Sequence, residues 1–216
     1  MTRHWRSGMM GRQTEIAKDL LDIKAVQIKT QEEQFFTWTS GIRSPIYCDN
    51  RLTMSYPGVR KKITQAFVAK IKKLATKPDV IAGCATAGIP HAAWVAHELD
   101  LPMVYVRSKP KGHGKGNQIE GKVERGQKVI VIEDLISTGG SSLETARVLK
   151  EAGLDVLAVY AIFTYGLEIS NRRFQEANIP FDTITSFDYL LGVLVQNNDL
   201  TEEDKIKLLT WRNELS

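Results

Sequence analysis

The sequence predicts an α/β fold in which a central parallel β-sheet is flanked by helices. Four apolar runs, at 79–82, 102–106, 128–132 and 156–163, have the length and composition of buried strands. Helical segments follow the first and third of these runs, and strands that alternate with helices form βαβ units with parallel strands. A small cap with hairpin character precedes this α/β part of the chain.

The composition indicates one soluble globular domain. The 216 residues are 43% hydrophobic and 25% charged, which is ordinary for a folded protein. No apolar run approaches the roughly 18 residues of a membrane span, and no secretory signal opens the chain, so we expect a cytoplasmic location. The two cysteines, Cys48 and Cys84, are too few for a disulfide scaffold and lack metal-ligand spacing.

The N-terminal part of the sequence divides into an arm and the start of the cap. Residues 1–13 show no periodicity, and we expect a leader or disordered arm there, outside a single domain at 14–216. A short amphipathic helix at 15–21 and a strand at 25–28 come next. Aromatic and polar residues then alternate between 35 and 49 around a Ser-Gly turn, which predicts a hairpin.

Two helices flank the first predicted strand of the sheet. One begins at the turn Pro57-Gly58 and repeats apolar residues at Ile63, Phe67 and Ile71, which form one face. The other carries Pro90 in its first turn, where the missing N–H of proline costs nothing. An apolar face therefore predicts the first helix, and a proline in its first turn marks the start of the second.

The C-terminal tail predicts two further helices. One covers 186–195, and the last begins at Glu202 after a weak capping box formed by Thr201 and Asp204. We expect these elements to complete the cap, which is formed mainly by residues 14–55.

Three of the predicted strands end in loops of unusual composition. The loop at 83–88 has small residues, the one at 107–121 is basic and rich in glycine, and the one at 133–141 passes from acids to hydroxyl residues and glycine. Ligands of parallel α/β sheets bind at the carboxyl ends of the strands. We therefore expect the three loops to converge on one site.

The loop at 133–141 has the composition of a phosphate site with an acidic rim. Backbone N–H groups of a tight loop before a helix bind phosphate dianions. Glu133 and Asp134 disfavour a phosphate alone, but they suit ribose hydroxyls or a cationic transition state beside it. Ser141 and Glu144 also have the spacing of a capping box, which is a purely structural reason for a serine here. The loop has neither the lysine of a Walker A motif nor the glycine spacing of a dinucleotide fold.

These residues carry a family resemblance. The stretch 129–141, Val-Ile-Val-Ile-Glu-Asp-Leu-Ile-Ser-Thr-Gly-Gly-Ser, closely resembles the signature of type I phosphoribosyltransferases, which bind phosphoribosyl pyrophosphate (PRPP). Three further stretches resemble the branch of that family that uses orotate. They are similar to its hood at 36–47, its pyrophosphate loop at 85–93 and its catalytic lid at 107–114. The resemblance covers residue 14 to the C-terminus and implies the type I phosphoribosyltransferase fold with a small N-terminal hood.

The resemblance also implies a reaction and its requirements. The ribose 5-phosphate of PRPP would pass to orotate, giving orotidine 5′-monophosphate and pyrophosphate in de novo pyrimidine (UMP) biosynthesis. Mg²⁺ would enter with the pyrophosphate group, so no dedicated metal ligand is assigned. We expect a homodimer that shares its lid loop across the interface, and we expect no nucleic-acid or membrane partner.

Residue roles follow from the same resemblance. It implies catalytic roles for Lys111, His113 and Asp134. It implies that Ser137 contacts orotate and that the hood backbone near Tyr47 and Cys48 sandwiches the pyrimidine. The residues implied to bind PRPP are Arg107, Lys111, His113, Glu133, Asp134, Leu135, Ile136, Ser137, Thr138, Gly139, Gly140 and Ser141.

The chemistry of the lid agrees with these roles. Loss of pyrophosphate leaves negative charge on the departing oxygens, and cations placed there stabilise the transition state more than the ground state. Arg107 and Lys111 have that charge, and His113 has a side chain that donates a proton near neutral pH. The alternative is a solvated basic turn with no role.

Four positions depart from some orotate-using enzymes. Those enzymes carry lysine where this chain has Thr39, Ala87 and Ser108, and arginine where it has Tyr165. Fewer side chains therefore meet the charge of the substrate, and we assign no role to these four positions.

Two alternatives to the orotate reaction remain open. One is a purine phosphoribosyltransferase, and the other is a regulator of the same fold that senses PRPP and binds nucleic acid. A nucleic-acid binder favours a broad basic face with interleaved aromatic residues. Here residues 107–125 alone contain six basic and two acidic residues, an excess equal to the chain's net charge of +4, which fits a small polyanion.

Overall fold

The computed structural model describes residues 3–38, 41–109 and 118–215. Its centre is a six-stranded sheet in the order β10-β9-β8-β5-β6-β7. All neighbours in this sheet are parallel except β6 and β7, so the predicted parallel α/β sheet is confirmed. Its strands are β5 (Val80–Cys84), β6 (Met103–Val106), β7 (Ile119–Glu120), β8 (Lys128–Ile136), β9 (Asp155–Thr164) and β10 (Phe181–Ser186).

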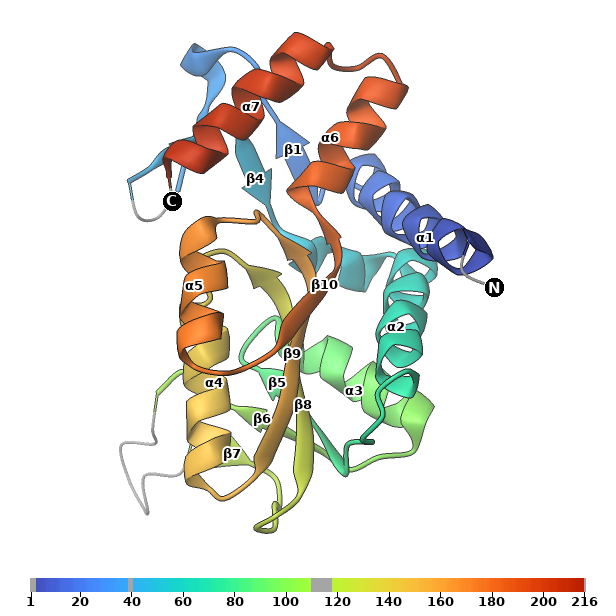
Figure 1. The fold of residues 1–216 in the computed structure, drawn as a ribbon, viewed down its shortest axis with the longest axis vertical. Helices are drawn as coiled ribbons and strands as arrows, with labels where there is room; N and C mark the ends of the chain where they lie inside the picture. The colour runs from blue at the N-terminus through green and yellow to red at the C-terminus, as the bar shows by residue number, and fades with distance from the viewer. Residues whose placement is uncertain (1–2, 39–40, 110–117, 216) are drawn as a thin grey trace.

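Helices cover both faces of this sheet (Figure 1). On one face lie α1 (Arg3–Asp22), α2 (Pro57–Lys72) and α3 (Gly88–Leu99), and on the other lie α4 (Gly140–Glu151) and α5 (Glu168–Glu176). Alternate residues of a strand point to opposite faces. Ile130 and Ile132 of β8 therefore join the core beneath the first group of helices, whereas Val129 and Val131 join the core beneath the second. This double burial explains the continuous apolar runs of the central strands.

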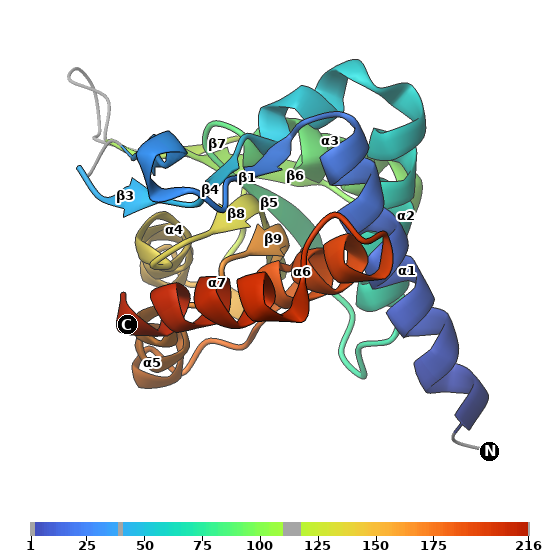
Figure 2. The same ribbon diagram turned by 90° about the horizontal axis from the view of Figure 1, so that it is seen from above.

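A smaller assembly, which we call the hood, lies at one end of the sheet (Figures 1 and 2). The predicted hairpin is present as the antiparallel pair β2 and β3, but the chain then continues into β4, which pairs with β1. The capping box of Thr201 and Asp204 is confirmed at the start of the last helix. The hood elements are β1 (Val26–Ile28), the 3₁₀ helix η1 (Glu32–Gln34), β2 (Phe36–Thr37), β3 (Arg43–Ser44), β4 (Ile46–Cys48), the 3₁₀ helix η2 (Asn50–Ser55), α6 (Phe187–Gln196) and α7 (Glu202–Glu214).

Some elements differ from the expectation. Residues 3–13, expected to be a leader or a disordered arm, form the first part of α1. The sequence also gave no signal for α5 and β10. The helix α5 buries only Ser170 and Phe174, and β10 lies at the sheet edge with Asp182 exposed, so neither has a strong apolar pattern. In the described part of the chain, no helix is long and apolar enough to cross a membrane.

Candidate active site

The topology of the sheet selects one edge for ligand binding. The chain leaves β5 through α3 to reach β6 on one side, and it leaves β8 through α4 to reach β9 on the other. Ligands of open α/β sheets bind outside the carboxyl ends of the strands at such a switch point. The predicted loops after β5 and β8 begin there, and the third loop follows β6, the next strand along. Lys111 and His113 of that third loop lie outside the described residues.

The two acids lie within a strand rather than after it. We expected the strand to end at Ile132, but β8 continues to Ile136. The reason is its neighbour β9, which stays paired as far as Ile136 and Thr164, while β5 pairs with β8 only to Ile132. The end of β8 therefore projects beyond β5 and carries Glu133 and Asp134 on a regular backbone.

The carboxylate of Glu133 is held by three protein donors. Its Oε1 accepts the Asp134 N–H at 2.9 Å, and its Oε2 accepts the hydroxyls of Ser141 at 3.1 Å and Ser142 at 3.3 Å. Glu133 is 4% exposed. The predicted capping box of Ser141 and Glu144 is therefore wrong, because the Ser141 hydroxyl holds the acid and Glu144 pairs with Arg147.

Burial changes the acidity of this pair. Desolvation raises the pKa of Glu133, and the nearby charge of Asp134 raises it further. Desolvation also raises the pKa of Asp134. Both carboxylates therefore gain from a ligand that donates hydrogen bonds or carries positive charge. Ribose hydroxyls and an oxocarbenium-like sugar have these properties.

The loop at 137–139 leads into a helix whose first turn is open to an anion. Gly139 is the N-cap of α4 in the left-handed conformation, and no side chain caps the helix. A Cβ at Gly139 would lie 2.8 Å from the Phe174 ring, so only glycine fits. Arg173 Nη1 donates to the Thr138 carbonyl at 3.2 Å and supports the loop from α5. The N-terminus of α4 therefore has the geometry of a phosphate site.

The remaining predicted PRPP residues divide by burial. Leu135 and Ile136 pack into the two apolar cores, so only their backbone faces the loop. Ser137 is half-buried, whereas Thr138, Gly140 and Ser141 are exposed.

The loop after β5 lies against the acids. A Cβ on Gly88, the first residue of α3, would lie 2.4 Å from the Ile132 carbonyl oxygen and 3.3 Å from the Cα of Glu133. The absence of a side chain at Gly88 therefore lets α3 begin directly beside the end of β8. The loop predicted to bind pyrophosphate and the acidic pair are thus neighbours.

The hood meets the sheet through aromatic side chains. Tyr47, on β4, is 39% exposed, and its ring lies 5.5 Å from that of Phe36. Cys48 is half-buried, and its thiol pKa is raised by burial and then by the charge of Asp134. Two of the three residues predicted to contact orotate, Tyr47 and Cys48, are therefore on one hood strand, β4, whereas Ser137 follows β8.

Tyr165 has a structural role at this junction. Its ring stacks on Trp38 of the hood at 5.0 Å, and burial raises the pKa of its hydroxyl. Trp38 Nε1 in turn donates to the Ile46 carbonyl at 3.0 Å. Where some orotate-using enzymes carry arginine, this chain therefore has a neutral anchor between the hood and the end of β9.

Arg107 lies at the root of the lid segment. Its N–H donates to the Gln118 carbonyl at 2.9 Å, and its guanidinium forms an ion pair with Glu120 at 3.5 Å. The short strand β7 pairs with β6, so both ends of the segment 107–120 are held together at the sheet edge. No pattern in the sequence predicted β7 (Ile119–Glu120).

Sequence reasoning also missed a buried polar group behind Asp134. Asn50 Nδ2 donates to the Asp134 carbonyl at 2.7 Å across 84 residues of chain. Thr53 and His91 lie behind Asn50 and are buried with it. No local pattern identifies such a contact, because its partners come from three separate elements.

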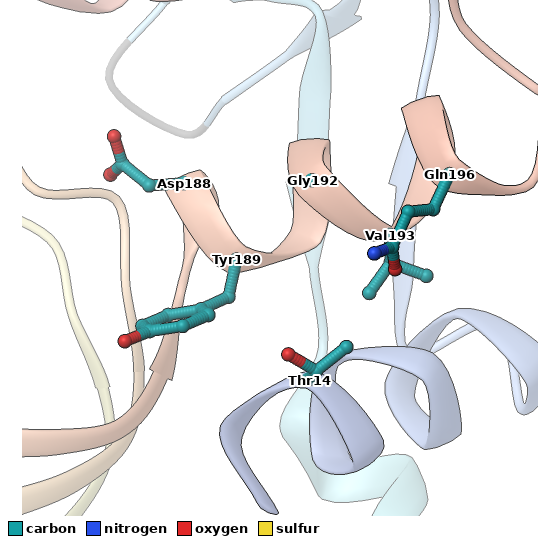
Figure 3. Close-up of a pocket in the computed structure, with 6 residues that line it drawn as sticks. All are labelled: Thr14, Asp188, Tyr189, Gly192, Val193 and Gln196. Atoms are coloured by element: carbon teal, nitrogen blue, oxygen red, sulfur yellow. The ribbon is translucent and has the colours of Figure 1, made fainter. Parts of the chain in front are cut away.

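Two other observations bear on ligands. A hollow of about 230 Å³ lies between α1 and α6, lined by Thr14, Asp188, Tyr189, Gly192, Val193 and Gln196 (Figure 3). It contains none of the predicted site residues. In the described part of the chain, no group of three or more His, Cys, Asp or Glu side chains is placed to hold a metal ion.

Comparisons with known proteins agree with this geometry. Residues 55–181 match the phosphoribosyl transferase domain. The chain is 61% identical over 201 residues to an orotate phosphoribosyltransferase of Oceanobacillus iheyensis, covering 93% of this chain and 98% of that protein. It is 54% identical over 211 residues to one from Fusobacterium nucleatum, covering 98% and 99%. A crystal structure of orotate phosphoribosyltransferase from Aeropyrum pernix matches with a TM-score of 0.72 at 25% identity, covering 86% and 99%.

Proposed function

The chain belongs to the orotate phosphoribosyltransferase family, and we propose that it transfers the ribose 5-phosphate of PRPP to orotate. The products are orotidine 5′-monophosphate and pyrophosphate, in pyrimidine biosynthesis. The observation that carries the proposal is the acidic pair of β8 beside the uncapped start of α4, under the hood. Together these supply hydrogen-bond acceptors for a ribose and donors for its 5-phosphate.

Each part of the substrate has a group of suitable chemistry. The 5-phosphate accepts hydrogen bonds from the backbone N–H groups of residues 137–141, and the Asp134 carboxylate accepts hydrogen bonds from the ribose hydroxyls. Glu133 also belongs to the ribose site. Its Oε2 already accepts bonds from Ser141 and Ser142, so a sugar hydroxyl donates to Oε1, which among the described residues accepts only the Asp134 N–H. Orotate lies between Ser137 and the hood backbone at Tyr47 and Cys48.

The reaction forms a bond from orotate to the anomeric carbon and breaks the bond from that carbon to pyrophosphate. Arg107 and Lys111 stabilise the negative charge on the leaving oxygens. His113 donates a hydrogen bond or proton to them. Burial raises the pKa of both Glu133 and Asp134, which supports a role beside positive charge such as that of the oxocarbenium-like sugar.

The donor set at this site fits Mg²⁺. Magnesium is held by oxygen ligands, usually one or two carboxylates together with substrate phosphates and waters. Asp134 supplies a partly accessible carboxylate near the end of β8, and Ser137 and Thr138 supply hydroxyls from the loop that follows this strand. When bound, the ion neutralises charge on the pyrophosphate group. A site shared with the substrate needs no cluster of protein ligands.

The proposal extends to assembly and location. We place the protein in the cytoplasm as a homodimer in which the lid loop of one subunit completes the site of the other. The two cysteines are unpaired, as suits a reducing compartment. The domain is proposed to comprise residues 14–216.

An acceptor assay tests the proposal. The full chain is mixed with PRPP and Mg²⁺, and orotate, adenine, hypoxanthine, xanthine or uracil is added in separate reactions. Turnover of orotate alone, followed by its ultraviolet absorbance, is expected. Inactivity with orotate would overturn the proposal, and turnover of a purine would replace it with a purine phosphoribosyltransferase.

A binding assay separates the enzyme from a regulator. The chain is titrated with RNA and DNA at physiological salt. Tight binding that weakens steeply with salt would favour a nucleic-acid-binding regulator. We expect no such binding.

A further inference from the structure

A chain of buried hydrogen bonds connects three elements behind Asp134. Asn50 Nδ2 donates to the Asp134 carbonyl at 2.7 Å. The Thr53 hydroxyl donates to the backbone carbonyl of Asn50 at 2.6 Å, and the same hydroxyl lies 3.3 Å from His91 Nε2. Asn50, Thr53 and His91 are each at most 1% exposed. The chain of bonds therefore runs from α3 through η2 to β8, entirely inside the protein.

Both backbone polar groups of Asp134 are held by side chains. Its N–H donates to Glu133 Oε1 at 2.9 Å, and its carbonyl accepts from Asn50 Nδ2 at 2.7 Å. At this point β8 has passed the end of its pairing with β5 at Ile132. The position of Asp134 on that side therefore depends on Glu133 and Asn50 instead of on a neighbouring strand.

The protons of this chain have one consistent arrangement. Thr53 has a single hydroxyl proton, which goes to the Asn50 carbonyl, so its oxygen accepts from His91. His91 then carries its proton on Nε2. Burial lowers the pKa of His91 to about 4, so the ring is neutral at physiological pH. The three hydrogen bonds therefore run in one direction, from His91 to Thr53, from Thr53 to Asn50 and from Asn50 to Asp134.

Stability alone does not account for the arrangement. His91 Nδ1 and Asn50 Oδ1 are buried without a hydrogen-bond partner in the described part of the chain. Each unpaired buried polar atom costs about 1–3 kcal/mol, so apolar side chains of similar shape would suit a purely structural contact. The polar chain therefore carries a cost in stability, as groups that hold an active site in place often do.

We propose that Asn50 is a positioning residue that sets the place of Asp134, and that Thr53 and His91 orient Asn50. This inference rests on the proposed function and deepens it. The element η2 follows the hood strand β4 after one residue, and α3 begins directly after the loop at 85–87. The hydrogen-bond chain therefore connects the hood, next to the proposed orotate site, and α3, next to the proposed pyrophosphate loop, to the backbone of Asp134.

Substitutions that keep shape but remove the bonds test the proposal. Asn50→Leu removes the amide, and Thr53→Val removes the hydroxyl, whereas Thr53→Ser keeps it. Thr185→Val is the matched control, because Thr185 is equally buried, has an unpartnered hydroxyl and lies on β10 at the far edge of the sheet. Steady-state kinetics, calorimetric titration with PRPP and Mg²⁺, and thermal unfolding are measured for each.

We expect Asn50→Leu and Thr53→Val to lower kcat/KM for PRPP by about 10²-fold, the effect of a reacting geometry misplaced by about 1 Å. Affinity for PRPP weakens in the calorimeter, while KM for orotate stays within about two-fold of wild type. Thr53→Ser restores the activity lost in Thr53→Val. Thr185→Val keeps wild-type kinetics.

The contrary outcomes are distinct. Wild-type kinetics in a folded Asn50→Leu or Thr53→Val protein, with only a lower unfolding temperature, would overturn the positioning role. If Asn50→Leu does not fold, the comparison of Thr53→Val with Thr53→Ser tests the positioning role. If the wild-type protein does not turn over orotate, the proposed function fails, and the PRPP titrations alone decide the inference. Unchanged affinity in the variants would then overturn it.

Discussion

Adjacent residues of one strand can have different surroundings, as Glu133 and Asp134 do. The Glu133 carboxylate is surrounded by protein donors, whereas Asp134 is partly accessible and its backbone is held by side chains. The sequence predicted an acidic pair beside a phosphate loop. It did not predict that one acid would organise the loop through Ser141 and Ser142.

The burial of Glu133 makes stability depend on pH. Its folded-state pKa is raised above the ordinary value of 4.5, first by desolvation. The stability that this group contributes is therefore fully present below 4.5 and is lost as the pH rises through the raised pKa. Each unit of pKa shift corresponds to roughly 1.4 kcal/mol. We expect Glu133→Gln to gain in unfolding free energy, relative to wild type, as the pH rises above 4.5.

Urea unfolding at several pH values measures this difference. Glu144→Gln is the control, because Arg147 lowers the pKa of the partly exposed Glu144 and its contribution has the opposite sign. If the unfolding free energies of wild type and Glu133→Gln changed in parallel with pH, the raised pKa of Glu133 in the folded state would be contradicted.

The lid lysine affords a separate test of the chemistry. Lys111→Ala is expected to lower kcat by about 10²-fold or more, because a cation preorganised at the leaving oxygens is lost. Unfolding by urea should be unchanged, since a basic glycine-rich loop contributes little to a core. Lys122→Ala is the control, because Lys122 belongs to the same basic segment but pairs with Glu124 at 2.9 Å. Wild-type turnover in Lys111→Ala would refute the assignment.

Among the elements, α3 begins directly beside the acidic pair. Gly88 permits this helix to lie against the end of β8, with the Ile132 carbonyl where a Cβ would be. Gly88→Ala is expected to destabilise the fold by about 1–3 kcal/mol, because backbone must move to relieve the clash. It should also lower affinity for PRPP, since the loop before α3 shifts.

A second glycine in a helix provides the control for this substitution. Gly192 lies inside α6 with no atom within 4 Å of a Cβ built there. Gly192→Ala is expected to stabilise the protein by roughly 0.5–1 kcal/mol, because alanine is the better helix former. Calorimetric melting and PRPP titration of both variants measure these effects. Equal stability of the two would contradict the close approach of α3.

The hood and one face of the sheet share a continuous core. Leu20 of α1, Ile46 of β4, Leu190 of α6 and Ile130 of β8 belong to one buried cluster. Parts that share a core unfold together, so we expect a single transition.

Leu20→Ala tests this coupling. Leu20 is fully buried, so the substitution should cost about 2–5 kcal/mol. The same shift is expected in far-ultraviolet circular dichroism and in intrinsic tryptophan fluorescence, to which the hood residues Trp38 and Trp211 contribute. Ile206→Ala, on an exposed face of α7, should change stability by no more than about 0.5 kcal/mol. Separate transitions for the two probes would contradict a shared core.

Local patterns were sufficient for the parallel sheet, its central strands and most of the helices, and the phosphate role of the loop at 137–141 stays a prediction. Apolar runs, turn residues and a strong signature are properties of short stretches, and burial on both faces made the central strands easy to recognise. The weak signals belong to edges, as in β7 and β10, where one side of a strand faces water and apolar residues are fewer.

Tertiary structure decided which side chains form hydrogen bonds with Glu133 and Asp134. Ser141 had the spacing of a helix cap but holds Glu133, and Asn50 reaches Asp134 across 84 residues. Tyr165 joins the hood to β9 by stacking on Trp38. These contacts depend on how separate elements pack, and packing brings together residues whose spacing along the chain carries no periodic signal. The sequence by itself therefore predicted which loop to propose as the substrate site, whereas the fold determined how the neighbouring acids are held.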